Sequence, residues 1–195
     1  MSASRPLPYV LAAGLFTAAC GKVVTEVGEE LWPGPDVADG GAPDVGADSA
    51  DGGPCRGDLS NIGMAADFHV ALSVTTTQNG LVAVANQRAY CSPSTFWDIR
   101  IDGGFIVVEA DDVVNYASAQ SPGPRVDDGL PHNVLMLRTS GRLSVVVDDA
   151  GSPSTPSTAS FGQLPPLAIG TDVCSPQDGT MPLIGTVANL CIASP

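Results

Sequence analysis

The sequence predicts an all-β domain, a sandwich or barrel of antiparallel strands, over residues 55–195. Short runs in which every second residue is hydrophobic recur along this part of the chain. Gly, Pro, Asp and Ser separate these runs, as turn residues do between short strands. No stretch repeats its apolar residues at helical spacing over three turns. A domain of about 140 residues is large enough to bury a core between two sheets.

Nine runs are expected to form strands: residues 67–74, 80–86, 96–101, 105–110, 113–119, 133–138, 142–148, 166–170 and 184–192. The first run, "DFHVALSV", alternates strictly, so one face of that strand carries its hydrophobic side chains, which are Phe68, Val70, Leu72 and Val74. Two pairs of runs flank short turns, "DGG" at 102–104 and "TSG" at 139–141. Both pairs are therefore predicted hairpins.

The N-terminus predicts export. Residues 9–19, "YVLAAGLFTAA", are apolar and follow a short segment that contains Arg5. About eleven apolar residues are too few to cross a bilayer, which needs about twenty. They have the length of a signal-peptide core. Residues 1–19 are therefore predicted to be a signal peptide.

The end of this segment, "TAAC", resembles the lipobox of bacterial lipoproteins. The resemblance implies cleavage before Cys20, lipidation of Cys20 and anchoring of the protein in a membrane through its acyl chains. Several chains on one residue give stable anchoring, whereas one chain does not. Thr17 departs from the usual Leu of the lipobox. Gly21, in place of Asp, favours the outer membrane or cell surface over the inner membrane.

Residues 20–54 are expected to be a disordered linker behind the lipidated cysteine. From Gly21 onward this segment has eight acidic residues and one basic residue, Lys22, and it is rich in Asp, Gly, Pro and Ala. Such a segment has little to bury and repels itself. The whole chain has a net charge of −13, which argues against a nucleic-acid partner because phosphates need a basic surface.

Four further cysteines, Cys55, Cys91, Cys174 and Cys191, predict two disulfides in an exported protein. Four cysteines allow three connectivities. A tight hairpin before the last strand would bring Cys174 and Cys191 together.

Four stretches in order resemble laminin G-like domains and together cover residues 67–192. They are "DFHVALSVTTTQNGLVAVANQ", "FWDIRIDGGFIVVEA", "VDDGLPHNVLMLRTSGRLSVVVDD" and "PLAIGTDVCSPQDGTMPLIGTVANLCI". The resemblance implies a concanavalin A-like jelly roll of two curved antiparallel sheets. Cys174 and Cys191 resemble the closing cysteines of that family, which implies that they pair, and Cys55 is then left for Cys91.

Two positions depart from the family pattern. Pro131-His132-Asn133 replaces an aromatic-His-His sequence, with His132 expected in a turn, and Asn189 stands where an acidic residue is common. Neither change breaks the expected fold, but both argue against transferring functional residues from the family to this chain.

The resemblance implies a non-catalytic module that recognises an extracellular glycan or protein. Glycan binding uses an exposed aromatic ring with polar groups around it, and the candidates here are Tyr90, Trp97 and Tyr116. Phe96 and Trp97 should point to opposite faces of one strand, with at least one of them in the core. A structural or envelope-assembly lipoprotein is the alternative interpretation.

A glycoside hydrolase is a weaker alternative. Jelly-roll glucanases often carry E-x-D-x-x-E on one strand, because one carboxyl donates a proton while another attacks or activates water. "EADDVV", residues 109–114, begins with Glu109 but has Val114 in place of the second Glu. Glu109 is therefore expected to face solvent without a catalytic role. His69 is expected on the outer face of its strand.

No cofactor is assigned, although calcium stays open. Calcium prefers six to eight oxygen ligands. The candidate carboxylates stand in expected loops: Asp111, Asp112, Asp127, Asp128, Asp148, Asp149, Asp172 and Asp178. The other interpretation is that these residues form turns through their side chains.

Overall fold

The computed structural model describes residues 57–175 and 177–194. The predicted signal peptide, the predicted lipidation site Cys20, the predicted linker and Cys55 all lie outside the described residues. Within the described part of the chain, no helix is long and apolar enough to cross a membrane.

The described residues form eleven strands: β1 (Phe68–Thr76), β2 (Val82–Arg88), β3 (Thr95–Asp102), β4 (Phe105–Asp112), β5 (Tyr116–Gln120), β6 (Pro131–Thr139), β7 (Arg142–Val147), β8 (Ala150–Gly151), β9 (Thr155–Pro156), β10 (Ala168–Ile169) and β11 (Gly185–Ala193). All nine predicted strands are present. The two short strands β8 and β9 were not predicted.

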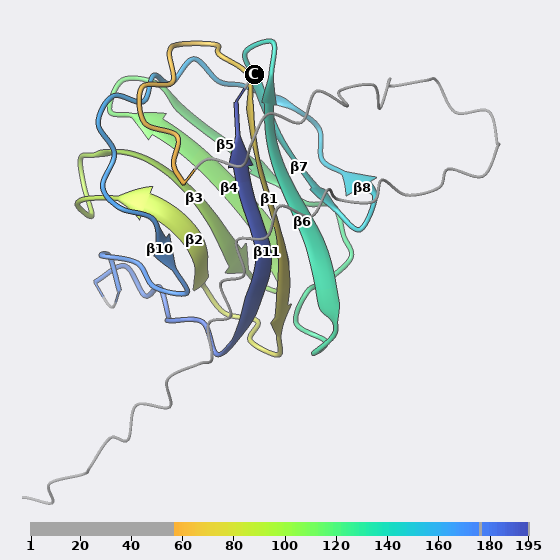
Figure 1. Cartoon of the computed structure of the whole chain (residues 1–195). Coiled ribbons are helices and arrows are strands. Elements are labelled where there is room, and N and C mark those ends of the chain that lie inside the picture. The colour runs from red at the N-terminus through yellow and green to blue at the C-terminus, as the bar shows by residue number, and fades with distance from the viewer. Residues whose placement is uncertain (1–56, 176, 195) are drawn as a thin grey trace, which may run out of the picture.

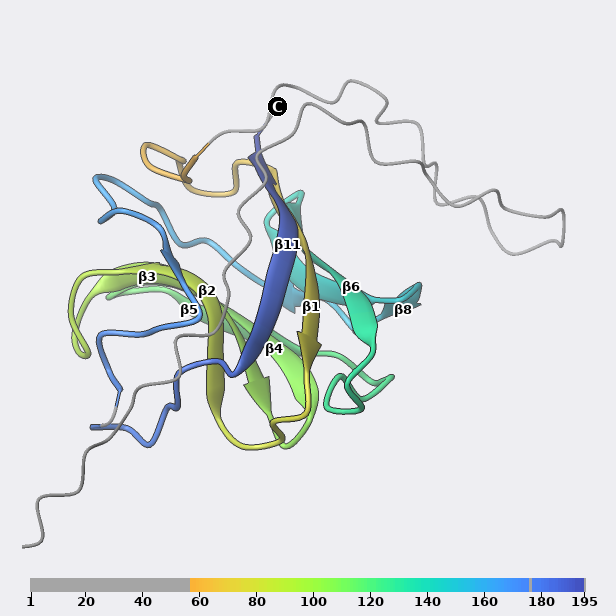
Figure 2. The same cartoon turned by 60° about the horizontal axis from the view of Figure 1, so that its bottom comes forward.

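The strands form two antiparallel sheets, which confirms the predicted sandwich. One sheet has the order β11-β1-β6-β7-β8, with β9 also paired to β7, and the other has the order β10-β2-β3-β4-β5. Figures 1 and 2 show them as two layers, with β11 and β1 in front and β2 to β5 behind. Strands distant in sequence lie side by side, since β1 pairs with both β11 and β6.

Both predicted hairpins are present, as β3–β4 and β6–β7. Gly104 and Gly141 adopt φ values of 86° and 70° in their turns, a conformation that suits glycine. Strand β5 begins at Tyr116 and not at the predicted Val113. Val113 has a φ of 77°, and the carboxylate of Asp111 accepts a hydrogen bond from its backbone N–H, so a turn forms there.

The core lies between the inner faces of the two sheets. The predicted alternation in β1 is confirmed, because its apolar residues Phe68, Val70, Leu72 and Val74 are all buried. The intervening residues of β1, including His69, are half-buried on the side of the six-stranded sheet that faces away from the core, which agrees with the expectation for His69. Strands β3 and β4 contribute further buried side chains, among them Trp97, Ile99, Ile106 and Val108.

Arg138 closes one end of this core with its guanidinium fully buried. It donates hydrogen bonds to the carbonyl oxygens of Ala66 (2.7 Å), Gly63 (2.9 Å) and Ala159 (2.5 Å). It also lies over the rings of Phe68 and Phe161, at 4.7 and 5.5 Å from the ring centroids. One side chain therefore joins the segment before β1, strand β6 and the segment after β9.

The predicted disulfide connectivity is wrong. Cys91 bonds to Cys174, with their Cα atoms 4.8 Å apart, so Cys174 does not pair with Cys191 and Cys91 does not pair with Cys55. Cys191 also takes part in a disulfide. It lies on β11 of the six-stranded sheet, whereas Cys91 and Cys174 lie in loops. No tight hairpin joins Cys174 to β11, because the chain between them passes along the edge of β2, where Met181 bonds to the backbone of Leu81 and Ala83.

We expect Arg138→Met to lower the free energy of unfolding by at least about 3 kcal/mol, because three buried carbonyl oxygens would lose a charged donor. Chemical denaturation at neutral pH measures this change. Arg142→Met is the matched control, because Arg142 is exposed on β7, and it should cost less than about 0.5 kcal/mol. Equal effects of the two substitutions would contradict the role assigned to Arg138.

Candidate functional site: the outer face of the five-stranded sheet

The outer face of the five-stranded sheet carries most of the polar side chains of its strands. Because side chains alternate along a strand, β2 to β5 send one set of residues to the core and the other set outward. The outward set consists of Ala83, Asn86 and Arg88 from β2, Phe96, Asp98, Arg100 and Asp102 from β3, Phe105, Val107, Glu109 and Asp111 from β4, and Tyr116, Ser118 and Gln120 from β5. We call this set the outer face.

Four charged residues form a compensated cluster on this face. Arg88 donates to the carboxylate of Asp98 at 2.8 Å and lies 3.8 Å from that of Glu109. Glu109 also accepts hydrogen bonds from Arg100 and from the Tyr116 hydroxyl at one oxygen, Oε1. Asp98 and Glu109 are direct cross-strand neighbours on β3 and β4. We call Arg88, Asp98, Arg100 and Glu109 the charge cluster.

Burial raises the pKa values of Asp98 and Tyr116 in this region. Desolvation, together with the negative charge of Glu109, raises the pKa of Asp98 to about 7. Desolvation and the hydrogen bond to Glu109 raise the pKa of Tyr116 to about 12. Tyr116 is therefore protonated at physiological pH, and its hydroxyl donates a hydrogen bond to Glu109.

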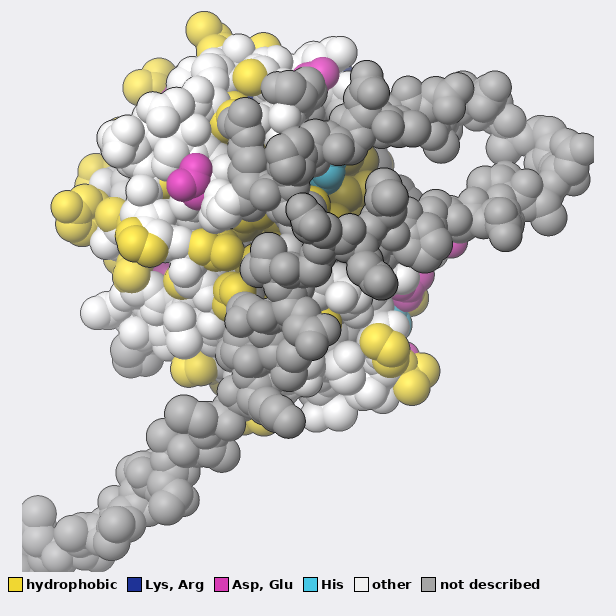
Figure 3. All heavy atoms as spheres, viewed as in Figure 1, with side chains coloured by type: hydrophobic (Ala, Val, Ile, Leu, Met, Phe, Trp, Pro, Cys, Tyr) yellow, Lys and Arg dark blue, Asp and Glu magenta, His cyan; other side chains and the backbone are white. Residues whose placement is uncertain are grey.

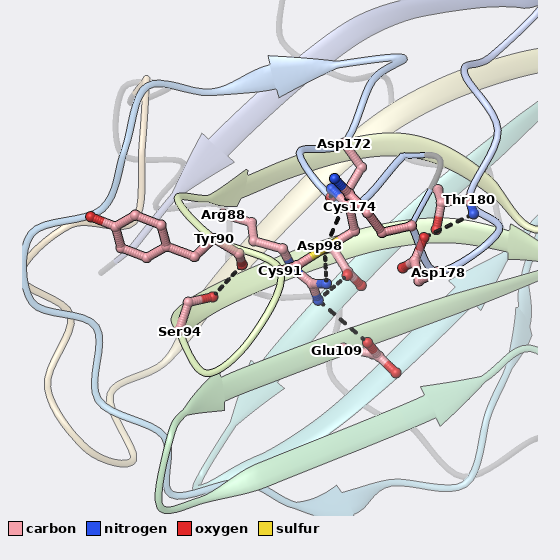
Figure 4. Close-up of a disulfide and its surroundings, with 11 residues drawn as sticks. Arg88, Tyr90, Cys91, Ser94, Asp98, Glu109, Asp172, Cys174, Asp178 and Thr180 are labelled. Carbon is pink, nitrogen blue, oxygen red and sulfur yellow. Dashed lines mark hydrogen bonds and ion pairs between the residues drawn. A yellow bond between two sulfur atoms is a disulfide. The ribbon is translucent and has the colours of Figure 1, made fainter.

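A loop covers the β2–β3 half of the outer face. This covering loop spans residues 171–180, of which Pro176 lies outside the described residues. Asn86 Nδ2 donates to the carbonyl of Thr171 at 2.7 Å, and Arg88 Nη1 lies 3.4 Å from the sulfur of Cys174. The Cys91–Cys174 disulfide fixes the loop beside Arg88 (Figure 4). Under this loop Asp98 is only 2% exposed.

The other half of the outer face, on β4 and β5, is open. Tyr116 is 58% exposed although its hydroxyl is held by Glu109. Gln120 is exposed and Ser118 half-buried on the same strand. The open half thus presents an oriented aromatic ring beside a hydroxyl, an amide and the edge of the charge cluster.

The sequence profile of the laminin G domain matches residues 74–174, which is more than half of the chain. The chain belongs to the laminin G domain family. No curated protein matches its sequence.

Two solved structures with laminin G domains share this fold. The mouse laminin α1 chain, domains LG4-5, superposes with a TM-score of 0.52 at 14% identity, over 70% of this chain and 38% of that chain. The LG1-3 region of the laminin α2 chain superposes with a TM-score of 0.50 at 16% identity, over 67% of this chain and 28% of that one. This chain thus spans less than two fifths of either relative.

The laminin G domain places its predicted aromatic candidates in different environments. Trp97 points into the core, where its indole N–H donates to Gln87 at 2.8 Å. Phe96 points to the face opposite to that of Trp97, as predicted, but it is buried with the guanidinium of Arg88 3.4 Å from its ring centroid. Tyr90 is 69% exposed in the loop after β2. Tyr116 is therefore the exposed aromatic that lies on the outer face itself.

Glu109 does not face solvent, contrary to the prediction. It points outward from β4, as alternation requires, but it is only 4% exposed because Arg88, Arg100 and Tyr116 surround its carboxylate. A cross-strand charge partner could have been sought in the sequence, because "DIRI" and "FIVVEA" flank a predicted hairpin. Hairpin register alone places the oppositely charged Arg100 diagonal to Glu109, since Asp98 lies opposite Glu109 and Arg100 lies opposite Val107.

Five of the eight candidate carboxylates are engaged as turn formers. Their oxygens accept hydrogen bonds from backbone N–H groups two or three residues later, as Asp111, Asp112, Asp128, Asp172 and Asp178 all show. Asp127 pairs with Arg125 instead. Among the described residues no group of three or more His, Cys, Asp or Glu side chains is arranged to hold a metal ion.

His132 lies in β6 and not in a turn, because that strand begins two residues earlier than predicted. Its ring nitrogens lie 2.5 Å from Asp148 and 3.0 Å from Asp128. Although burial opposes it, the hydrogen bonds to these two carboxylates raise the pKa of His132. The side chain thus joins the loop before β6 to the turn after β7, at one end of the six-stranded sheet.

We expect the double variant Cys91→Ser/Cys174→Ser to loosen the covering loop. Beneath the loop, Arg88 Nε and Asp98 Oδ1 are buried without hydrogen-bond partners among the described residues, so covering them is unfavourable without the covalent link. Amide hydrogen exchange in residues 171–180 should become faster. The unfolding free energy should fall by roughly 4 kcal/mol, because the disulfide closes a long loop.

Asp172→Ala is a suitable control for this experiment, because it removes the 2.7 Å hydrogen bond to the Cys174 N–H and leaves the disulfide in place. Unchanged exchange of the loop in the double variant would show that Asn86 and Arg88 suffice to hold it.

Proposed function

We propose that this protein is a lipid-anchored, extracellular recognition module that binds a glycan on the open half of its outer face without catalysis. Membership of the laminin G domain family supports a ligand-binding role. Anchoring through acyl chains on Cys20, at the outer membrane or cell surface, rests on the lipobox-like sequence alone.

The orientation of Tyr116 carries the proposal. An exposed tyrosine normally rotates freely, but here the hydroxyl is bonded to Glu109, and Glu109 is bonded to Arg100. The ring is thus fixed and remains 58% exposed. A fixed aromatic ring flanked by hydroxyl and amide groups suits stacking against a sugar ring with hydrogen bonds to its hydroxyls.

A glycan fits this face better than a protein partner. Protein-binding surfaces have a desolvated apolar centre, whereas the open half presents Tyr116, Ser118 and Gln120 beside a charge cluster. The exposed apolar residues Val113 and Val114 lie at the tip of the β4–β5 turn.

The non-catalytic role rests on the state of the two neighbouring carboxylates. A glycosidase needs one carboxyl that gives its proton to substrate and another that reaches the sugar or water. Asp98 and Glu109 are bound to arginines and almost inaccessible. Val114, which replaces the second Glu of the glucanase pattern, is 86% exposed at the turn.

We expect Tyr116→Ala to weaken glycan binding by about tenfold, because an oriented aromatic platform contributes about 1 kcal/mol or more. A glycan array of the mature chain identifies ligands, and titration calorimetry measures Kd. Tyr90→Ala is the matched control, because Tyr90 is equally exposed but lies in a loop off the sheet, and it should leave Kd within about twofold. Glycan binding lost equally in both variants would contradict the site. Binding to a protein but to no glycan would leave a recognition module with a protein ligand, and binding to neither would favour the structural or envelope-assembly alternative.

We expect Cys20→Ser to abolish fatty-acid incorporation and to release the protein from membranes or leave it unprocessed. The reason is that the apolar segment before Cys20 is too short to span a bilayer. Metabolic labelling with a clickable fatty acid followed by membrane fractionation measures both effects, with Thr17→Leu as a control that should preserve labelling. Equal labelling of Cys20→Ser would refute lipidation at this residue.

A further inference from the structure

The arginines of the described residues are all engaged with other protein groups. Arg88 and Arg100 bind the carboxylates of the charge cluster. Arg125 pairs with Asp127 and Arg142 with Ser154, whereas Arg138 is buried against three carbonyls. The described residues contain no lysine. On the outer face, neither Arg88 nor Arg100 can therefore bind an anionic group without first giving up a carboxylate partner.

The net negative charge of the described residues also disfavours the binding of anionic ligands. Residues 57–194 hold five arginines, twelve aspartates and one glutamate, so with neutral histidines their net charge is −8. On the surface seen in Figure 3, Asp and Glu side chains are visible and hardly any Arg side chains are. A polyanion approaching this domain is repelled within about a Debye length, which is about 10 Å at 0.1 M salt.

The charge cluster itself is locally balanced. Arg88 and Arg100 face Asp98 and Glu109, so when Asp98 is ionised, above its pKa of about 7, the two positive and two negative charges of the cluster compensate one another. What remains for a ligand on the open half is the ring of Tyr116, the Gln120 amide, the Ser118 hydroxyl and the carboxylate of Asp111, which accepts a hydrogen bond from the Val113 N–H. These groups suit uncharged polyhydroxyl surfaces.

We propose that the ligand of this face is an uncharged glycan, and that the domain rejects sulfated and uronic-acid glycans. The inference rests on the proposed function and specifies its ligand class. Tyr116 stacks on a neutral sugar ring, Gln120 and Ser118 hydrogen-bond its hydroxyls, and the charge cluster orients Tyr116 without contacting a charged group of the ligand.

The test uses the mature chain and three classes of oligosaccharide of equal length. Neutral probes are oligomers of glucose, xylose, mannose and N-acetylglucosamine, the anionic probes are heparin and galacturonic acid oligomers, and the cationic probe is a glucosamine oligomer. Titration at about 0.01 M and about 0.15 M ionic strength separates charge-driven binding from stacking. Each titration is repeated with calcium and with a chelator.

We expect at least one neutral oligomer to bind with a Kd that changes less than about twofold between the two salt concentrations, because no charge pair forms. Gln120→Ala should weaken this binding by about threefold to tenfold, as loss of one hydrogen bond does, and Tyr90→Ala should not weaken it. Anionic oligomers should show no binding that depends on Tyr116.

The outcomes separate this inference from the proposed function. Tyr116-dependent binding of heparin, galacturonate or glucosamine oligomers, without any neutral glycan, would overturn the inference and leave glycan recognition standing. The absence of Tyr116-dependent binding to all three classes would overturn both.

Discussion

The arginines and carboxylates of the charge cluster pair with one another on the outer face of the five-stranded sheet, and the burial of that face by the covering loop depends on this pairing. Strict alternation sends apolar residues of β3 and β4 to the core and places Asp98, Arg100 and Glu109 on the opposite face. Isolated charges could not be buried there, because desolvation of an ion costs several kcal/mol. Arg88 from β2 completes the set. Only with the charges paired can a loop lie over half of the sheet.

The covering loop then divides one sheet face into two functional parts. Over β2 and β3 the loop encloses Phe96 and Asp98, and the Cys91–Cys174 bond holds it down. Over β4 and β5 the face stays open. Glu109 lies between the two parts, since it contacts Arg88 on the covered side and Tyr116 on the open side. The buried half thereby fixes the geometry of the exposed half.

The strands were predictable because their signal is local. Alternation in β1, and turn sequences such as "DGG", depend on neighbouring residues alone, so strand positions and both hairpins followed from the sequence. The pairing of Cys174 did not follow, because its partner depends on the path of a loop that crosses to another strand. The burial of Glu109 was missed for a similar reason: alternation gives the face of the sheet, but not what other side chains place over it.

Arg138 shows why a buried arginine alone does not mark a binding site. Its guanidinium is satisfied by three neutral carbonyls and two aromatic rings and is itself fully buried. Burial lowers its pKa, against the weak attraction of Asp67 and Asp112. Arg100 differs, because its carboxylate partner also orients an exposed ring. What distinguishes the outer face as a candidate site is therefore not charge or burial, but a buried network that ends in a fixed and accessible side chain.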